Sequence, residues 1–193
     1  MKEILLATNN AHKLREARAI LEPFGFFVIS LAQAGISSNP EETGESFAQN
    51  ALIKAQAVAA LCPKRTILAD DSGLCIEYFN GYPGLYSSRF LGEDTSYYEK
   101  NEIVLRLLRD VKNRHAWYTC AAVLYQSGEY RHFEAQCHGE IGFRQSGQNG
   151  FGFDPIFVVN NHSLAELSES QKNQMSHRYL AFREVAEALG EKI

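Results

Sequence analysis

Two adjacent aspartates, Asp70 and Asp71, are the residues of this sequence best suited to acid–base or metal chemistry. They follow a short apolar run at 66–69 that predicts a strand, and ligand sites of α/β proteins gather at the carboxyl ends of strands. Two neighbouring carboxylates at such a point face different directions, so that one can hold a metal while the other acts on water. Because Asp, Ser and Gly are also common turn formers, an ordinary turn at 70–73 is the alternative.

A second acidic pair, Glu41 and Glu42, ends a long polar loop just before a helix that is predicted to begin near Ser46. Acidic residues ahead of a helix often do no more than complement its dipole. If either glutamate approaches Asp71, the cluster offers the hard oxygen ligands that Mg²⁺ prefers, with water and a substrate phosphate completing the octahedron. The value of this pair therefore depends on its neighbours in the fold.

Polar and cationic residues at two predicted helix starts are suited to binding anions. Residues 8–13 form a strand-to-helix junction whose backbone N–H groups suit phosphate oxygens, although a plain N-cap with a surface Lys13 is the alternative. Near the C-terminus, His177 and Arg178 occupy the first turn of a helix, where the dipole disfavours cations. A nearby anion or ligand acceptor would account for them, and Lys172 supplies a third donor; an exposed polar helix start is the alternative.

The segment 150–155, G-F-G-F-D-P, places aromatic rings between glycines ahead of a predicted strand. A flat ring on a permissive backbone suits stacking against a nucleobase. Strand alternation turns Phe151 and Phe153 the same way, and we expect one of them to belong to the core. Asp154 precedes a proline and is therefore held in an extended conformation, which fixes the direction of its carboxylate.

The elements that must position these groups alternate between strands and helices. We expect strands at 3–7, 26–29, 66–69, 75–79, 116–125, 130–137 and 155–159, and helices at about 11–21, 46–62, 95–112 and 176–189, with a further helix opened by Ser163. The break at 127–129 makes two of the strands a hairpin. Interleaved helices and strands with one hairpin predict an α/β fold with a mixed sheet, and the lack of repeats or linkers favours one continuous domain.

The composition excludes several classes of protein. With 193 residues, 45% of them hydrophobic, and a formal net charge of −4, the chain has an ordinary core and lacks the basic face that nucleic-acid binding usually needs. No apolar run approaches the length of a membrane span, and the N-terminus has no signal-peptide h-region, so we expect a cytoplasmic protein without membrane contact.

The cysteines and histidines show no metal or disulfide pattern in the sequence. The cysteines are scattered without a C-x-x-C pair: Cys62, Cys75, Cys120 and Cys137. We expect them to be small buried hydrophobes. His132 and His138 lack ligand partners at metal spacing, which favours surface or packing roles for both.

Six segments, taken in chain order, resemble the inosine triphosphate pyrophosphatase family, whose members act on non-standard purine nucleotides such as ITP, dITP and XTP. They are T-x-N-x-x-K at 8–13, E-E-T-G-x-S/T-F-x-x-N-A-x-x-K-A at 41–55, A-D-D-S-G-L at 69–74, G-x-P-G-x-x-S-x-R at 81–89, G-F-G-Y/F-D-P-x-F at 150–157 and S-H-R at 176–178. Each segment alone is modest, but the ordered set spans the chain and is highly specific.

The resemblance implies a fold, a reaction and a set of site residues. The fold would be an elongated mixed sheet flanked by helices, forming a single domain over residues 1–193 in two lobes with a nucleotide cleft between them, assembled as a homodimer. The reaction would be Mg²⁺-dependent hydrolysis of a nucleoside triphosphate to the monophosphate and pyrophosphate. Asp71 matches the general base, and Glu41, Glu42 and Asp71 match the positions tied to Mg²⁺.

The remaining site residues carried over from the family fall into two sets. The phosphates would be bound by Thr8, Asn9, Asn10, Ala11, His12, Lys13, Lys54 and Ser72. The nucleoside would be bound by Phe151, Gly152, Phe153, Asp154, Lys172, His177 and Arg178. Phe153 stands where a Tyr is common and Asn9 where a Gly is frequent, which puts in doubt a hydroxyl contact and the backbone conformation beside the phosphates. Alternative functions are a Maf-like pyrophosphatase of other nucleotide specificity and a non-catalytic nucleotide-binding regulator.

Overall fold

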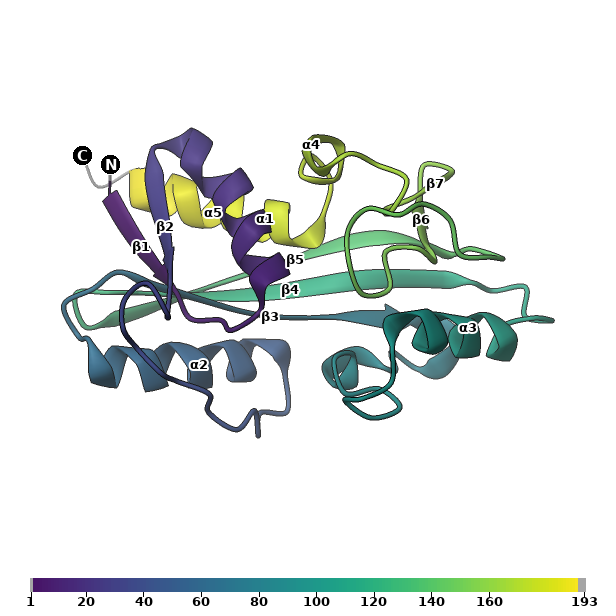
Figure 1. The fold of residues 1–193 in the computed structure, drawn as a ribbon, viewed down its shortest axis with the longest axis horizontal. Helices are drawn as coiled ribbons and strands as arrows, with labels where there is room; N and C mark the ends of the chain where they lie inside the picture. The colour runs from purple at the N-terminus through teal and green to yellow at the C-terminus, as the bar shows by residue number, and fades with distance from the viewer. Residues whose placement is uncertain (1, 191–193) are drawn as a thin grey trace. The chain divides into compact units, whose positions relative to one another are not determined.

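The computed structural model describes residues 2–190 (Figure 1). Its strands are β1 (Lys2–Leu6), β2 (Phe26–Ser30), β3 (Ile67–Ile76), β4 (His115–Gln126), β5 (Glu129–Ile141), β6 (Phe157–Val159) and β7 (His162–Ser163). Its helices are α1 (Ala11–Leu21), α2 (Phe47–Leu61), α3 (Tyr97–Leu107), α4 (Glu169–Lys172) and α5 (His177–Gly190), with short 3-10 helices at Glu22–Phe24, Glu77–Phe79 and Gly84–Tyr86.

The strands form a seven-stranded sheet in the order β2-β1-β3-β4-β5-β6-β7. β1 pairs in parallel with both β2 and β3, whereas β5 pairs antiparallel with β6, and β6 antiparallel with β7. The predicted α/β fold with a mixed sheet is therefore confirmed. The chain divides into two compact units, one made of the residues up to Asp71, Cys120–Ala135 and the chain from Ser176 on, the other of Ser72–Thr119 and Gln136–Met175.

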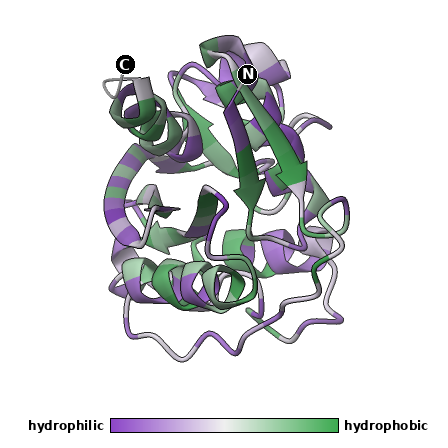
Figure 2. Cartoon of the chain, turned by 90° about the vertical axis from the view of Figure 1, so that its left-hand side faces the viewer, coloured by the Kyte–Doolittle hydropathy of each residue, from purple (hydrophilic) through white to green (hydrophobic). Residues whose placement is uncertain are grey.

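In the first unit, successive residues of β1 face opposite sides of the sheet. Ile4 and Leu6 belong to a core cluster shared with α1 and α5, whereas Leu5 belongs to a second cluster shared with α2. This is the alternation expected of a strand buried on both faces. As a result α1 and α5 cover one face of the sheet in this unit and α2 covers the other (Figures 1 and 2). Much of β2 is coloured hydrophobic in Figure 2, as expected of a buried strand.

The second unit has a core of its own. Val104 of α3 packs with Leu74 of β3, Phe157 of β6 and the aromatic ring of Phe153. Tyr118 of β4 meets Phe157 edge to face, with ring centroids 4.8 Å apart. This core fixes the loop that carries the segment 150–155, because Phe153 is one of its largest buried side chains.

Local signals at several helix starts and at the hairpin are confirmed. The side chain of Asn10 caps α1 by accepting from the backbone N–H groups of His12 and Lys13, and Ser46 caps α2. Ser127 and Gly128 have φ values of 54° and 91° at the β4–β5 turn. Two consecutive positive φ values match the twist of an antiparallel hairpin, which explains the sharp reversal at this point.

Two predicted elements are wrong. The alternative of an ordinary turn at 70–73 is excluded, and the strands predicted at 66–69 and 75–79 are one strand. β3 continues to Ile76, since a strand buried on both faces can carry charged residues when partners meet them. The end of the predicted strand is wrong, because Glu77–Phe79 is a 3-10 helix. No helix begins at Ser163, which lies in β7. Its hydroxyl donates to the carbonyl of Ser146 and so caps nothing, and the next helix, α4, is capped by Ser168 instead. The helix expected at 95–112 is also shorter, because α3 ends at Leu107.

The expectation of buried cysteines is confirmed for three of the four, whereas Cys62 is only partly buried. All are free thiols, and Cys75, Cys120 and Cys137 are buried. Burial raises the pKa of Cys120 to about 12 and those of Cys75 and Cys137 to about 11, so these side chains stay neutral. Among residues 2–190, none of the helices has the length and apolar character of a membrane span.

Candidate active site

Asp70 and Asp71 lie side by side on β3 but point to opposite faces of the sheet. Because side chains alternate along a strand, Asp70 faces the side covered by α1 and α5, while Asp71 faces α2. The expectation that the two carboxylates point in different directions is therefore confirmed, although its cause is strand alternation within a continuous strand. Each carboxylate meets a different set of partners.

On the α2 side, Asp71 is held by two residues one helical turn apart. Asn50 donates from Nδ2 to Asp71 Oδ2 at 3.1 Å, and Lys54 Nζ lies 3.4 Å from Asp71 Oδ1. Lys54 also contacts Glu42 Oε1 at 2.9 Å. The side-chain oxygen of Asn50 in turn accepts from the backbone N–H of Gly44 at 2.8 Å, so the loop before α2 is tied to the same group.

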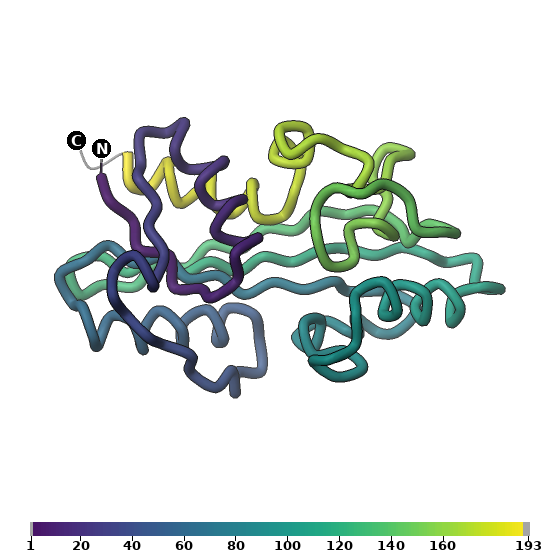
Figure 3. Tube along the Cα trace, in the orientation of Figure 1, coloured from purple at the N-terminus to yellow at the C-terminus, as the bar shows by residue number. Residues whose placement is uncertain are grey.

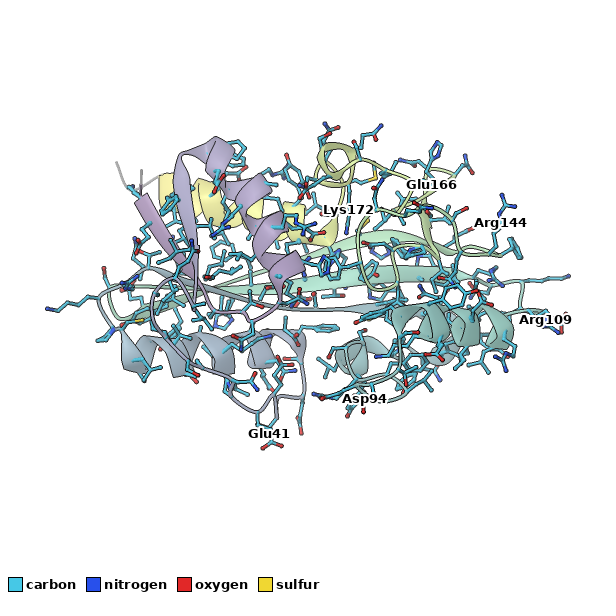
Figure 4. All side chains as sticks on the ribbon, viewed as in Figure 1. Glu41, Asp94, Arg109, Arg144, Glu166 and Lys172 are labelled. Carbon is cyan, nitrogen blue, oxygen red and sulfur yellow. The ribbon has the colours of Figure 1, made fainter. Side chains whose placement is uncertain are left out.

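The charges on the α2 side do not balance. Burial favours the neutral form of Lys54, but Asp71, Asp70 and Glu42 outweigh it and raise the pKa of the lysine, which stays protonated. One ammonium thus faces the carboxylates of Asp71 and Glu42, which leaves excess negative charge. Glu41 lies in the long loop between β2 and α2, whose path is traced in Figure 3. Its side chain is exposed and extends outward from this loop (Figure 4).

On the opposite face, Asp70 is enclosed by cations. Lys13 Nζ lies 3.0 Å from Asp70 Oδ2, and the same oxygen accepts from Arg178 Nη2 at 3.0 Å and Nε at 3.3 Å. Arg178 also pairs through Nη1 with Glu16 of α1. Burial alone would raise the pKa of Asp70, but Lys13, Arg178 and Lys54 outweigh it and hold that pKa far below its usual range. Asp70 is therefore a fixed anion and unsuited to accepting a proton.

This buried network accounts for the cation at the start of α5. An anion was expected near Arg178, and the structure supplies two, the carboxylates of Asp70 and Glu16. Their charges raise the pKa of Arg178 despite its burial. Since the guanidinium is only 1% exposed, it is a buried structural group as well as the nucleoside-binding residue that the resemblance implies. His177 is buried beside it in the first turn of α5.

The junction at 8–13 is held mainly by its own side chains. Thr8 Oγ1 accepts from the backbone N–H of Asn10, and Asn9 Nδ2 donates to the carbonyl of Ser38 at 3.0 Å. The N–H groups of His12 and Lys13 are bound by Asn10, so the Lys13 ammonium is the most evident donor of this segment. Ala11 and His12 are exposed at the first turn of α1.

In the second unit, the loop at 150–154 is organised around Asp154. Its Oδ2 accepts from the backbone N–H of Phe151 at 2.8 Å and contacts Lys172 Nζ at 2.6 Å. The Lys172 ammonium lies 5.0 Å from the centroid of the Phe151 ring, within cation–π range. The position of Lys172 is shown in Figure 4. Gly150 has φ +71°, and a Cβ there would meet Asp154 Oδ2 at 2.2 Å, which explains why a glycine occupies that position.

The two phenylalanines of this loop differ in burial. Phe153 is 2% exposed and packs against Phe90 and Tyr97, so it is the core member of the pair, as expected of one of them. Phe151 is half-buried and is the ring that we assign to stacking on the base. The Phe found in place of the common Tyr therefore lies in an apolar environment. Gly152 follows Phe151 with φ +70° and faces Tyr97.

Sequence reasoning missed two site residues, Glu16 and Asn50. Asn50 is fully buried and donates to Asp71. Glu16 is almost fully buried and binds Arg178, the partner of Asp70. Glu16 lies beside Ala17 and Ile20 on the buried side of α1. A charged residue within an apolar stripe indicates a buried partner of opposite charge, because an unpaired charge is costly to bury. Asn50 lies one helical turn before Lys54, a spacing that places both residues on one face of α2.

The 81–89 segment has a packing function. A Cβ on Gly73 would lie 2.2 Å from the carbonyl oxygen of Gly84 and 2.6 Å from Ser87 Oγ. Ser87 Oγ accepts from the backbone N–H of Leu74 at 2.9 Å and donates to Gly84. This segment therefore fixes β3 just after Asp71 and Ser72.

The predicted site residues thus form three groups in the structure. Glu42, Lys54 and Asp71 meet on one face of β3, Lys13 and Arg178 meet on the other, and Phe151, Asp154 and Lys172 meet in the loop of the second unit. Within residues 2–190, no three His, Cys, Asp or Glu side chains form a group spaced to hold a metal ion.

Comparisons with known proteins show what the chain is similar to in sequence and fold. The dITP/XTP pyrophosphatase of Bacillus subtilis is 41% identical over 194 residues, covering 98% of both chains, and that of Bacillus licheniformis is 39% identical over 199 residues, covering 98% of both. The solved Ham1 proteins of Staphylococcus aureus and Coxiella burnetii are 37% and 35% identical, with TM-scores of 0.87 and 0.88; each covers 99% of this chain and 100% of the other. The family model described as Ham1 family matches residues 4–188, and the chain belongs to that family.

Proposed function

We propose that this protein hydrolyses non-standard purine nucleoside triphosphates, such as ITP, dITP and XTP, to the monophosphate and pyrophosphate, and so cleanses the nucleotide pool. Curated relatives at about 40% identity over nearly their whole length bear the name dITP/XTP pyrophosphatase. The observation that carries the proposal is the Asp71 group, in which a carboxylate on β3 is oriented by Asn50 and adjoins a charged lysine.

The donor set around Asp71 fits a divalent cation. Asp71 and Glu42 offer hard carboxylate oxygens, and the single charge of Lys54 leaves them with excess negative charge. Asp71 and Glu42 would hold Mg²⁺, with water and phosphate oxygens completing six ligands. The family resemblance implies Glu41 as a further ligand, and in the structure this side chain extends outward. When bound, the ion would neutralise the charge of the triphosphate and favour attack at phosphorus.

The protein's own groups would perform the remaining chemistry. Asp71 accepts a proton from, or orients, the water that attacks the α-phosphorus; the bond from that phosphorus to the bridging oxygen breaks, and pyrophosphate leaves. Asn50 orients the Asp71 carboxylate through its hydrogen bond. Lys54 and Lys13 donate to phosphate oxygens, with Ser72 and the segment 8–12 as further phosphate contacts. Positioning and electrostatics supply most of the rate in such reactions.

The base would be bound by the residues that the family resemblance assigns to the nucleoside. Phe151 stacks on the purine while Lys172, His177 and Arg178 direct donors at it. A guanidinium only donates, so it matches a 6-keto oxygen and opposes the 6-amino group of adenine. Leaving such donors unmatched produces discrimination on the order of 10⁴. The two-lobed nucleotide cleft implied by the family remains part of this proposal.

A substrate panel tests the proposal. Purified protein with Mg²⁺ should release pyrophosphate from dITP, ITP and XTP far faster than from dATP, ATP and pyrimidine triphosphates. Equal turnover of ATP would refute the specificity, and preference for a pyrimidine would support a Maf-like activity instead. Absence of any turnover in a folded protein that binds ITP would indicate a non-catalytic regulator.

We also propose a cytoplasmic homodimer. Exposed aromatic and aliphatic side chains of the second unit, among them Tyr82, Tyr86, Leu91 and Tyr98, offer an apolar surface for a second copy. Light scattering on the purified protein should give twice the mass of the chain, whereas a monomer at micromolar concentration would contradict the assembly.

A further inference from the structure

Two histidines of the second unit, distant from each other in the sequence, meet edge to edge at the surface of the β4–β5 hairpin. His115 Nε2 lies 3.4 Å from His138 Nδ1, and the ring planes differ by 18°. The ring centroids are 5.5 Å apart. This distance exceeds the nitrogen–nitrogen distance by about one ring width, so each of the two nitrogens lies on the side of its ring that faces the other ring. Sequence spacing had suggested only surface or packing roles for His138.

The second nitrogen of His115 has its own partner. His115 Nδ1 faces Glu77 Oε2 at 3.4 Å, and Asn113 Nδ2 donates to the same carboxylate oxygen at 2.9 Å. A carboxylate at one imidazole nitrogen favours the tautomer that carries its proton there, which leaves the lone pair on the other nitrogen. Glu77 therefore directs the lone pair of His115 Nε2 toward His138.

We propose that His115 Nε2 and His138 Nδ1 bind a divalent transition-metal ion of the Zn²⁺ type, with water in the remaining positions. Zn–N bonds of about 2.0–2.1 Å in a tetrahedron place two nitrogens about 3.3–3.4 Å apart. The observed separation of 3.4 Å, at which the two rings can also share a hydrogen bond, equals that edge. Glu77 is the outer partner that orients the His115 ring, as carboxylates do behind metal-bound imidazoles.

This site differs in chemistry from the Asp71 group. Two neutral imidazoles suit Zn²⁺, Co²⁺, Ni²⁺ or Cu²⁺, whereas carboxylate oxygens suit Mg²⁺. Ions that occupy the histidine pair should therefore not be displaced by millimolar Mg²⁺. Binding should also weaken at acid pH, because protons compete for both nitrogens.

The chain carries its own reporter for the site. Trp117, the only tryptophan of the sequence, has its ring centroid 5.8 Å from that of His115 and 6.2 Å from that of His138. Co²⁺ at the pair would quench its fluorescence strongly at this distance. A titration with CoCl₂, followed by displacement with ZnCl₂, thus measures occupancy without any enzyme assay.

The test compares the intact protein with four variants. Saturable quenching is expected in the wild type, with reversal by EDTA and no effect of 5 to 10 mM Mg²⁺, roughly the concentration range in which hard-cation sites fill. His115→Ala and His138→Ala should each abolish saturable quenching, and Glu77→Gln should weaken Co²⁺ binding about tenfold or more. His132→Ala, on the same strand as His138, is the matched control and should bind as the wild type does.

Two outcomes would overturn the assignment. One is quenching that persists with an unchanged dissociation constant in both His115→Ala and His138→Ala. The other is quenching that Mg²⁺ reverses in the wild type, because the ion would then occupy carboxylates. Circular dichroism of each variant distinguishes loss of the site from loss of the fold.

Discussion

The two faces of β3 carry the same residue type in opposite settings. Asp70 is surrounded by Lys13 and Arg178, and together with Glu16 these side chains form two anions matched by two cations. Asp71 shares the single cation Lys54 with Glu42. A balanced buried network fixes its members, whereas an unbalanced group retains the capacity to bind a further cation. Adjacent aspartates are therefore expected to differ in role, Asp70 in holding Arg178 and Asp71 in the reaction.

The largest loss of stability is expected from breaking the balanced side. Asp70→Asn leaves the charges of Arg178 and Lys13 without their buried partner, and removing one member of such a pair costs about 3–5 kcal/mol. Urea unfolding should show this loss, while Asp94→Asn, at an exposed loop position (Figure 4), should change stability by less than about 0.5 kcal/mol. Equal stability of Asp70→Asn and the wild type would mean that the network is not structural.

The same contrast extends to the two rings of the 150–154 loop. Phe153→Ala empties a core position and should cost about 3–5 kcal/mol of stability, as buried aromatic truncations do. Phe151→Ala should leave stability nearly unchanged but raise the KM for dITP by roughly 10- to 100-fold, the value of stacking on one base. If Phe151→Ala has a normal KM, that ring does not bind the base.

On the unbalanced side, Glu42→Gln should raise the Mg²⁺ concentration needed for half-maximal activity by about tenfold, since it removes one carboxylate ligand. Glu45→Gln, an exposed residue of the same loop, is the matched control and should leave that concentration unchanged. A shift of the same size in both variants would point to general surface charge. No shift in Glu42→Gln would remove this residue from the metal site.

A smaller effect concerns acid stability. The pKa of Asp70 is lower in the folded than in the unfolded chain, so the unfolded chain binds more protons in acid and stability falls as the pH drops. The loss from this carboxyl should begin below about pH 4, near the unfolded value, with a slope of at most about 1.4 kcal/mol per pH unit. Unfolding measured between pH 5 and pH 3 should show a shallower fall in Asp70→Asn than in the wild type.

Local signals in the sequence predicted most elements correctly. The helix starts near residues 11 and 46 and the hairpin break at 127–129 depend only on neighbouring residues, and all three are confirmed. Ser163 carried a similar signal but failed, because its hydroxyl binds the distant carbonyl of Ser146. Local patterns therefore fail where a long-range partner competes for the same group.

The site was less accessible to sequence reasoning than the fold. The continuity of β3 through 70–73 depends on cations brought in by α1, α2 and α5, none of which is near in the sequence. For the same reason Glu16, and the meeting of His115 with His138, appear only in the structure. The assignment of Asp71 over Asp70 rested on the family motif, and the charge balance of the two faces now supports it physically.

The most direct test of this account is the rate of pyrophosphate release from dITP by Asp71→Asn at saturating Mg²⁺, measured together with its free energy of unfolding. The account predicts that kcat falls by about 10²- to 10⁴-fold, the usual loss on removing a general base, while stability changes by no more than about 1 kcal/mol. A folded Asp71→Asn protein with near-normal kcat would contradict it.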